Sequence, residues 1–168
     1  DSILGFIQDK IHINDKWDIT PAIRYSHYGT YDNTAEDGST SSVNNSSSST
    51  ITPTINTQYA FDDTMSAYFG WTKIYRPVKA GDLTLQDKNL WNGMKLEDEK
   101  GDVWTFGVRK DLSDKTSVAL HYDWTDMSNA VTSYSVMTKI INNVPEYENR
   151  AVNAKETKKS FNVTADHR

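Results

Sequence analysis

Three side chains between residues 117 and 123 are of the types that perform hydrolysis. Ser117, His121 and Asp123 recur at even spacings in a segment that alternates apolar and polar residues. If that segment is a strand, all three lie on one face, as a nucleophile, its base and an orienting carboxylate would require. Residues two apart on a strand stand side by side at about 6–7 Å, so we expect no hydrogen-bonded chain among them. We interpret them as polar residues of one sheet face, and the sequence predicts no catalytic site.

Candidate metal ligands are sparse. His27 could ligate haem iron, but it has no partner histidine in its segment. The acidic pairs Glu36-Asp37 and Asp62-Asp63 each offer two adjacent carboxylates, whereas calcium takes about six to eight oxygen ligands. The chain has no cysteine, which excludes a thiolate site and a disulfide framework. The sequence therefore predicts no metal site and no cofactor.

The elements that carry these residues are hairpins repeated three times. Short polar turns centre on Asp15, Asp63 and Asp114, so the turn recurs after 48 and then 51 residues. Such turns, near residues 14–16, 62–64 and 113–115, suit tight connections between antiparallel strands. The other strand ends are joined by long polar segments, about 33–50, 76–101 and 128–158. Tight turns on one side and long loops on the other are typical of an outer-membrane β-barrel, with the turns in the periplasm and the loops outside the cell.

The strands alternate with period two, which predicts a sheet with one apolar and one polar face. We expect residues 19, 21, 23, 67, 69, 71, 118, 120 and 122 to face lipid, and residues 20, 24, 66, 72, 117, 121 and 123 to face the lumen. A soluble sheet would also alternate. Three features favour lipid: aromatic residues near the loop-side ends, strands longer than the usual 5–6 residues, and charges on the polar face that a packed core would reject.

Composition agrees with a barrel and excludes other classes. The mean hydropathy is -0.69, and no apolar run approaches 18 residues, so no transmembrane helix is predicted. The net charge of -5 is spread through the chain without a basic patch, which excludes nucleic acid as a partner. No signal peptide opens the sequence.

The predicted fold is all-β, an antiparallel meander of about seven long transmembrane strands. Bacterial single-chain barrels have even numbers of strands, at least about eight, so we expect the chain to be an internal part of a larger barrel. The predicted strands are residues 2–13, 17–31, 51–61, 64–75, 102–112, 115–127 and 158–168.

Two segments resemble TonB-dependent outer-membrane receptors. The first is Gly5-Phe6-Ile7-Gln8-Asp9, a turn, and Ile19-Thr20-Pro21-Ala22-Ile23-Arg24-Tyr25. It is similar to the family's aromatic-x-Gln-Asp, turn, Leu-Thr-Pro-Gly-Leu-Arg-Tyr, with Ala22 at the usual Gly. The second runs from Ile74-Tyr75-Arg76-Pro77 through Leu96-Glu97-x-Glu99-Lys100 to Trp104-x-x-Gly107-Val108-Arg109. It resembles the family's aromatic-Arg-x-Pro and Leu-x-Pro-Glu-Lys segments, with one residue missing before Pro77 and Asp98 at the usual Pro.

The resemblance implies active import. Such receptors have a barrel of about 22 strands closed by an N-terminal plug. They take up iron-siderophores, haem, cobalamin or glycans, and the TonB complex of the inner membrane supplies the energy through a box ahead of the plug. The implied partners are outer-membrane lipid, a small-molecule ligand such as an iron chelate, and the TonB complex. A passive porin and a small structural or adhesive barrel remain alternatives.

Specificity in such a receptor would lie in the loops. The segment Asn33–Thr50 holds seven Ser, three Thr and three Asn, a composition that cannot bury apolar area. Aromatic rings and a guanidinium near the loop-side mouth could contact an anionic iron chelate by stacking and charge. These candidate ligand-binding residues are Tyr28, Tyr31, Tyr75, Arg76 and Trp91.

Overall fold

The computed structural model of the chain describes residues 2–29, 32–34, 40–42, 47–78 and 96–167. The strands are β1 (Ser2–Gln8), β2 (Ile11–Asn14), β3 (Trp17–Tyr28), β4 (Asp32–Thr34), β5 (Thr40–Ser42), β6 (Ser48–Asp62), β7 (Met65–Arg76), β8 (Glu99–Ser113), β9 (Thr116–Ile141) and β10 (Val144–His167). In the part of the chain that is described, no helix is long and apolar enough to span a membrane.

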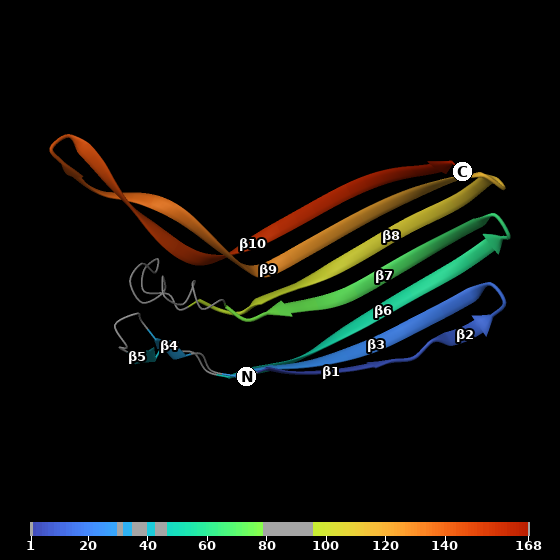
Figure 1. Cartoon of the computed structure of the whole chain (residues 1–168), viewed down its shortest axis with the longest axis horizontal. Helices are drawn as coiled ribbons and strands as arrows, with labels where there is room; N and C mark the ends of the chain where they lie inside the picture. Colours follow the sequence, from blue (N-terminus) through green and yellow to red (C-terminus); the bar gives the residue numbers. More distant parts are fainter. Residues whose placement is uncertain (1, 30–31, 35–39, 43–46, 79–95, 168) are drawn as a thin grey trace.

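The strands form one antiparallel sheet in the order β1-β3-β6-β7-β8-β9-β10, and β2 also pairs with β3 (Figure 1). β4 and β5 form a separate two-stranded sheet. Because β1 and β2 lie in line along β3, the large sheet is a meander of seven consecutive strands. The predicted all-β meander is confirmed, and the described residues contain no pairing between β1 and β10.

The break between β1 and β2 lies opposite a proline. Gln8 pairs with Ala22 and Ile11 pairs with Ile19, so Asp9 and Lys10 lie opposite Pro21 and Thr20. The Asp9 backbone N–H donates to the Pro21 carbonyl at 3.2 Å, but Pro21 has no N–H to return a bond. The ladder is interrupted there because one of its two hydrogen bonds cannot form.

Each tight hairpin turn is capped in the same way. The chain turns at Asp15-Lys16, Asp63-Thr64 and Asp114-Lys115. The residue before each turn accepts a hydrogen bond from the backbone N–H two residues later, with its Oδ1 or Oγ at 2.9 Å (Asn14), 2.7 Å (Asp62) and 3.3 Å (Ser113). Local side-chain bonds of this kind satisfy a turn N–H without a second strand.

The strand register separates the two faces as the alternation predicts. Phe69, Phe106, Tyr122 and Phe161 lie directly opposite one another across β7, β8, β9 and β10. Thr20, Asn56, Gly70, Thr105 and Asp123 form a polar row one residue away along the strands. Directly opposed residues share a face, so the predicted lipid-facing and lumen-facing sets lie on opposite faces.

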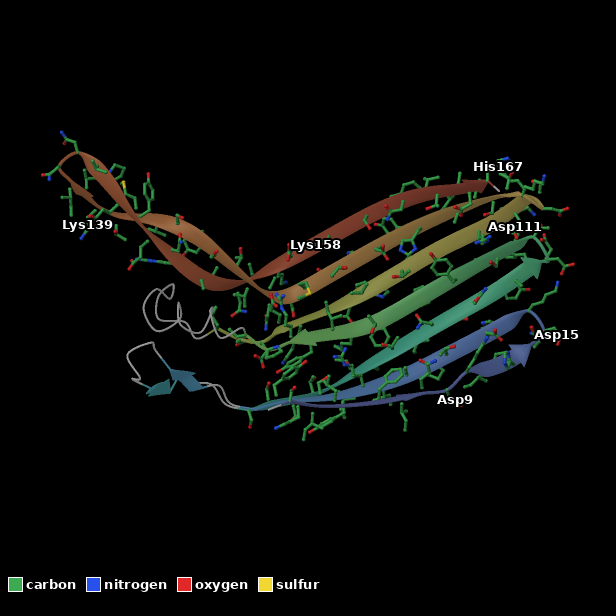
Figure 2. All side chains as sticks on the ribbon, in the orientation of Figure 1. Asp9, Asp15, Asp111, Lys139, Lys158 and His167 are labelled. Carbon is green, nitrogen blue, oxygen red and sulfur yellow. The ribbon has the colours of Figure 1, made fainter. Side chains whose placement is uncertain are left out.

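The sheet is a single layer with almost no core (Figure 2). The buried apolar residues of the described part are Ala22, Val78, Leu96, Ala130 and Ala151. Large apolar side chains are exposed instead, among them Ile7 at 74% and Phe161 at 64%. The apolar face is therefore not packed against a second sheet. Packing between two sheets would have contradicted the prediction that this face contacts lipid.

The segment 128–158 differs from the expected loop. β9 and β10 continue through it and extend past the other strands as a twisted two-stranded ribbon (Figure 1). Its turn is Asn142-Asn143, with φ of 51° and 61°. Two consecutive left-handed residues define a two-residue turn that matches strand twist, and Asn tolerates this conformation better than most residues. The residues that indicate this turn are the Asn-Asn pair between Ile141 and Val144, which the expectation of a long loop did not take into account.

Candidate functional site

The candidate mouth residues lie where β3 and β7 end, beside the base of the segment that joins β7 to β8. Tyr28 and Tyr75 stack with ring centroids 6.2 Å apart and planes tilted by 36°. Tyr31 and Trp91 lie outside the described residues. The structure thus brings Tyr28 and Tyr75 of the predicted set into contact, and Arg76 follows Tyr75 at the end of β7.

Two carboxylates fix the mouth residues of β7. The Tyr75 hydroxyl donates to Asp98 Oδ2 at 2.5 Å, and Asp98 Oδ1 accepts the Val78 backbone N–H at 3.1 Å. Arg76 pairs with Glu99, whose side chain is almost completely buried. The paired chains at Arg76 and Glu99 therefore hold both ends of the joining segment together.

The described residues at the β8 end of this joining segment also form hydrogen bonds to the ribbon of β9 and β10. Glu99 Oε1 accepts the Val131 backbone N–H at 2.8 Å, while Asn153 accepts from the Glu97 N–H at 2.7 Å and donates to the Glu97 carbonyl at 2.8 Å. A small apolar cluster of Val78, Leu96 and Ala151, with Val131 packed against it, lies beside these bonds. Sequence reasoning missed Asp98, Glu99 and Asn153, because their partners lie 20 to 56 residues away.

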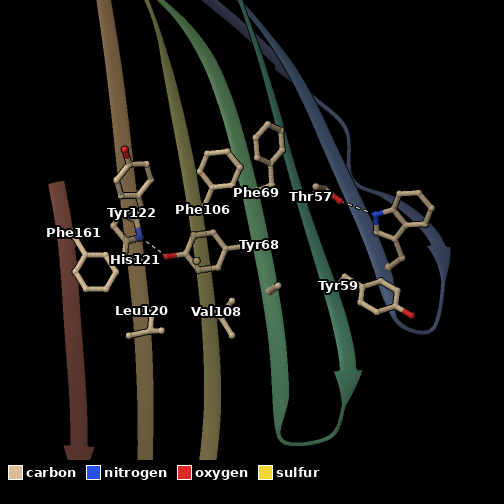
Figure 3. A pocket seen from close by; sticks show the side chains of 13 residues that line it. Thr57, Tyr59, Tyr68, Phe69, Phe106, Val108, Leu120, His121, Tyr122 and Phe161 are labelled. Carbon is tan, nitrogen blue, oxygen red and sulfur yellow. Dashed lines mark hydrogen bonds between the residues drawn. The ribbon is translucent and has the colours of Figure 1, made fainter. Parts of the chain in front are cut away.

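A second polar group lies in the middle of the polar face. Tyr68 on β7 reaches across β8 and its hydroxyl hydrogen-bonds to His121 Nδ1 on β9 (Figure 3). His121 Nε2 lies 2.7 Å from Asp123 Oδ2, and Thr105 Oγ1 donates to Asp123 Oδ1 at 2.9 Å. Gly107 lies between them in the register, and a Cβ there would overlap the Tyr68 ring. Glycine at this position therefore leaves the space that Tyr68 crosses.

This arrangement corrects one expectation about the polar face. Our expectation that His121 and Asp123 stand apart without a hydrogen bond was wrong, because both side chains bend toward each other on the strand. Ser117 takes no part: its Oγ accepts from Arg109 Nη2 at 3.3 Å. Both imidazole nitrogens are engaged, so the chain Tyr68–His121–Asp123 is a closed polar network and not a serine-based triad.

The other candidate ligands have ordinary structural partners. His27 Nδ1 lies 2.8 Å from Ser49 Oγ. Asp62 accepts bonds from the Thr64 N–H and hydroxyl, at 2.7 and 2.6 Å, within its turn. Glu36 and Asp37 lie outside the described residues. Within residues 2–29, 32–34, 40–42, 47–78 and 96–167, no group of three or more His, Cys, Asp or Glu is placed to hold a metal ion.

Comparison with known proteins identifies the family. A sequence model described as TonB dependent receptor-like, beta-barrel, matches residues 1–163. The chain belongs to the TonB-dependent receptor family. This family consists of bacterial outer-membrane β-barrel proteins, so the chain lies in the outer membrane as part of such a barrel. A search of curated proteins finds no match.

Solved structures agree on the fold. The copper transporter OprC superposes with a TM-score of 0.72 at 12% identity, covering 99% of this chain and 27% of OprC. Two variants of the FrpB iron transporter from Neisseria meningitidis, F5-1 (apoprotein form) and F3-3, give TM-scores of 0.64 and 0.63 at 17% and 16% identity. Each comparison covers 99% of this chain and 23% of FrpB. The chain therefore spans about a quarter of the length of these solved structures.

Proposed function

We propose that this chain forms part of the barrel wall of an energy-coupled outer-membrane importer of a scarce nutrient. The observation that carries the proposal is the family match over residues 1–163. The single-layer sheet supports it, because one face is rich in exposed apolar side chains and the other is polar. A wall between lipid and a water-filled or plugged lumen needs both faces.

The proposed orientation has the tight turns in the periplasm and the ribbon of β9 and β10 outside the cell. Outer-membrane barrels have short periplasmic turns and longer extracellular connections. The three capped turns lie at one end of the sheet, and the ribbon extends from the other (Figure 1). The partners in this proposal are outer-membrane lipid on the apolar face and the TonB complex, which acts on a plug.

The proposed substrate is an iron chelate, either an iron-siderophore or haem. The names of similar structures, a copper transporter and an iron transporter, support metal uptake in general. The stacked Tyr28 and Tyr75 would offer ring faces to a flat or aromatic chelate. Arg76 is paired with Glu99, so we propose that its first role is to hold the mouth and that the aromatic pair makes the main contact. Tyr31 and Trp91 would add to it.

The test is uptake of radioactive iron, supplied as a siderophore complex or as haem, by cells that carry the intact gene. We expect uptake that stops when the TonB complex is deleted. A Tyr28→Ala/Tyr75→Ala variant should raise the half-saturating chelate concentration, while a matched Tyr134→Ala/Tyr147→Ala variant on the ribbon should not. Uptake that continues unchanged without the complex would make the protein a passive porin. Absence of uptake for all chelates would favour a structural or adhesive barrel.

A further inference from the structure

A hollow lies on the apolar face just beyond a row of tryptophans. Trp71, Trp104 and Trp124 are directly opposed across β7, β8 and β9. Two residues further toward the ribbon end, Lys73, Asp102 and Asp126 form the next row on that face. The face therefore changes from aromatic to charged within one step along the strands, as a surface does where it leaves the hydrocarbon of a membrane.

Three lysines line this hollow, which has a volume of about 340 Å³. Lys73, Lys100 and Lys155 are exposed, and none forms an ion pair with an acid among the residues that the structure describes. The two carboxylates of the hollow already have neutral donors. Trp71 Nε1 donates to Asp102 Oδ1 at 3.0 Å, and Thr157 Oγ1 donates to Asp126 Oδ1 at 3.0 Å. The hollow thus carries one net positive charge.

A fourth lysine adds to the positive charge beside the tryptophans. Lys159 lies opposite Trp124 in the register, and its Nζ stands 5.4 Å from the centre of the Trp124 ring. Toward the turn end, a groove of about 660 Å³ runs along the same face between Phe69, Phe106, Leu120, Tyr122 and Phe161. Positive charge, an indole row and an apolar groove therefore follow one another along the strands.

We propose that this surface binds a membrane amphiphile with a phosphate headgroup. Lys73, Lys100 and Lys155 would hold the phosphate, and the apolar groove would take an acyl chain. Charge complementarity carries the headgroup, because lysine is a compact cation that binds phosphate and each basic residue near a membrane surface adds to attraction for anionic lipid. Because the apolar groove lies on the same face as the lysines, a lipid with an acyl chain fits this surface better than a free anion does. The inference rests on the proposed function in one respect, namely that this face contacts lipid.

The test measures lipid bound to the intact receptor that carries this chain, delipidated in neutral detergent. Dioleoyl phosphatidic acid, phosphatidylcholine and inorganic phosphate are added separately, and retained lipid is counted by native mass spectrometry. The variant is Lys73→Gln/Lys100→Gln/Lys155→Gln. The control, Lys10→Gln/Lys16→Gln/Lys115→Gln, removes the same charge at the turn end. Far-ultraviolet circular dichroism confirms that each variant is folded.

We expect the parent and the control to bind phosphatidic acid in preference to phosphatidylcholine. The triple variant should lose about fivefold in affinity per lysine, or on the order of a hundredfold in total. Replacing the same three lysines by arginine should preserve binding. Equal affinity of the triple variant and the parent would overturn the proposal. Displacement of phosphatidic acid by millimolar inorganic phosphate would also overturn it, because the site would then be one for a free anion.

The outcome is separable from that of the uptake experiment. If the receptor retains lipid through these lysines but shows no energy-dependent uptake, the lipid site is supported and the importer proposal is refuted. If uptake depends on energy but lipid retention does not depend on these lysines, only the proposal of a lipid site is refuted.

Discussion

Gly107 offers a direct test of the polar network, through the substitution Gly107→Ala. This substitution has two opposing effects on the free energy of unfolding. Alanine restricts the unfolded chain, which stabilises a protein by about 0.4–1 kcal/mol where the folded backbone accepts it. The added Cβ would overlap the Tyr68 ring, so Tyr68 must leave its position above β8.

The cost of that displacement can be estimated from its parts. Tyr68 would lose its hydrogen bond to His121, worth about 1 kcal/mol, and overpacking typically costs about 1–3 kcal/mol. The ring end of a tyrosine can swing aside, which places the strain at the lower end of that range. We expect Gly107→Ala to lower the free energy of unfolding by about 1–2 kcal/mol.

A double-mutant cycle distinguishes this explanation from a general effect on the strand. In a Tyr68→Ala background the obstacle is absent, so Gly107→Ala should be neutral or stabilising. The sign of its effect should therefore reverse, with a coupling free energy of about 2 kcal/mol. The measurement is urea unfolding of the intact receptor in lipid vesicles, followed by tryptophan fluorescence. An equal cost of Gly107→Ala in both backgrounds would refute the reasoning.

Three further predictions concern the turns and faces. Hydrogen bonds from the Thr64 hydroxyl and N–H lower the pKa of Asp62, so the ionised carboxylate stabilises the turn above the unfolded pKa near 3.8, and this stabilisation is lost as pH falls through the lower folded pKa. Amide exchange at Thr64 should speed up as the pH falls through that folded pKa. The substitution Asp62→Asn should remove this pH dependence. Because the chain has no cysteine, Phe106→Cys should react with a lipid-soluble maleimide and Thr105→Cys with a water-soluble one, and the reverse pattern would invert the faces. Asn143→Val should destabilise the ribbon tip by about 1–2 kcal/mol, seen as faster protease cleavage, whereas Asn143→Gly should not.

The sequence predicted most of the sheet because its information is local. Alternation in β6 to β9 and the polar residues at the turns depend on neighbours two or three positions away. The accuracy is lower in the ribbon of β9 and β10, where the sequence indicated a loop from about residue 128 to residue 158. Charged and polar residues such as Glu146, Glu148 and Arg150 obscure the alternation there, because a two-stranded ribbon can expose both faces and needs no apolar side.

The candidate site was predicted less well because its contacts are distant in sequence. The stacking of Tyr28 on Tyr75 joins two strands that are not adjacent in the sheet, and the hydrogen bond from the Val131 N–H to Glu99 joins β8 to the ribbon. The link between His121 and Asp123 was missed for a different reason. Backbone spacing sets where a side chain starts, but two flexible side chains on one face can still close the gap.

The near absence of a core makes the stability of this sheet depend on its surroundings. A soluble domain of this size buries most of its apolar surface, because burial is the main favourable contribution to folding. Here few apolar residues of the described part are buried, among them Ala22 and Leu96, while Ile7 and Phe161 are exposed. The outer edges of β1 and β10 also lack strand partners within the described sheet. Lipid must cover the apolar face and further strands must satisfy the edges, since unpaired backbone groups are costly in hydrocarbon. The 168-residue chain alone should therefore aggregate in water, and its variants are informative only within an intact barrel.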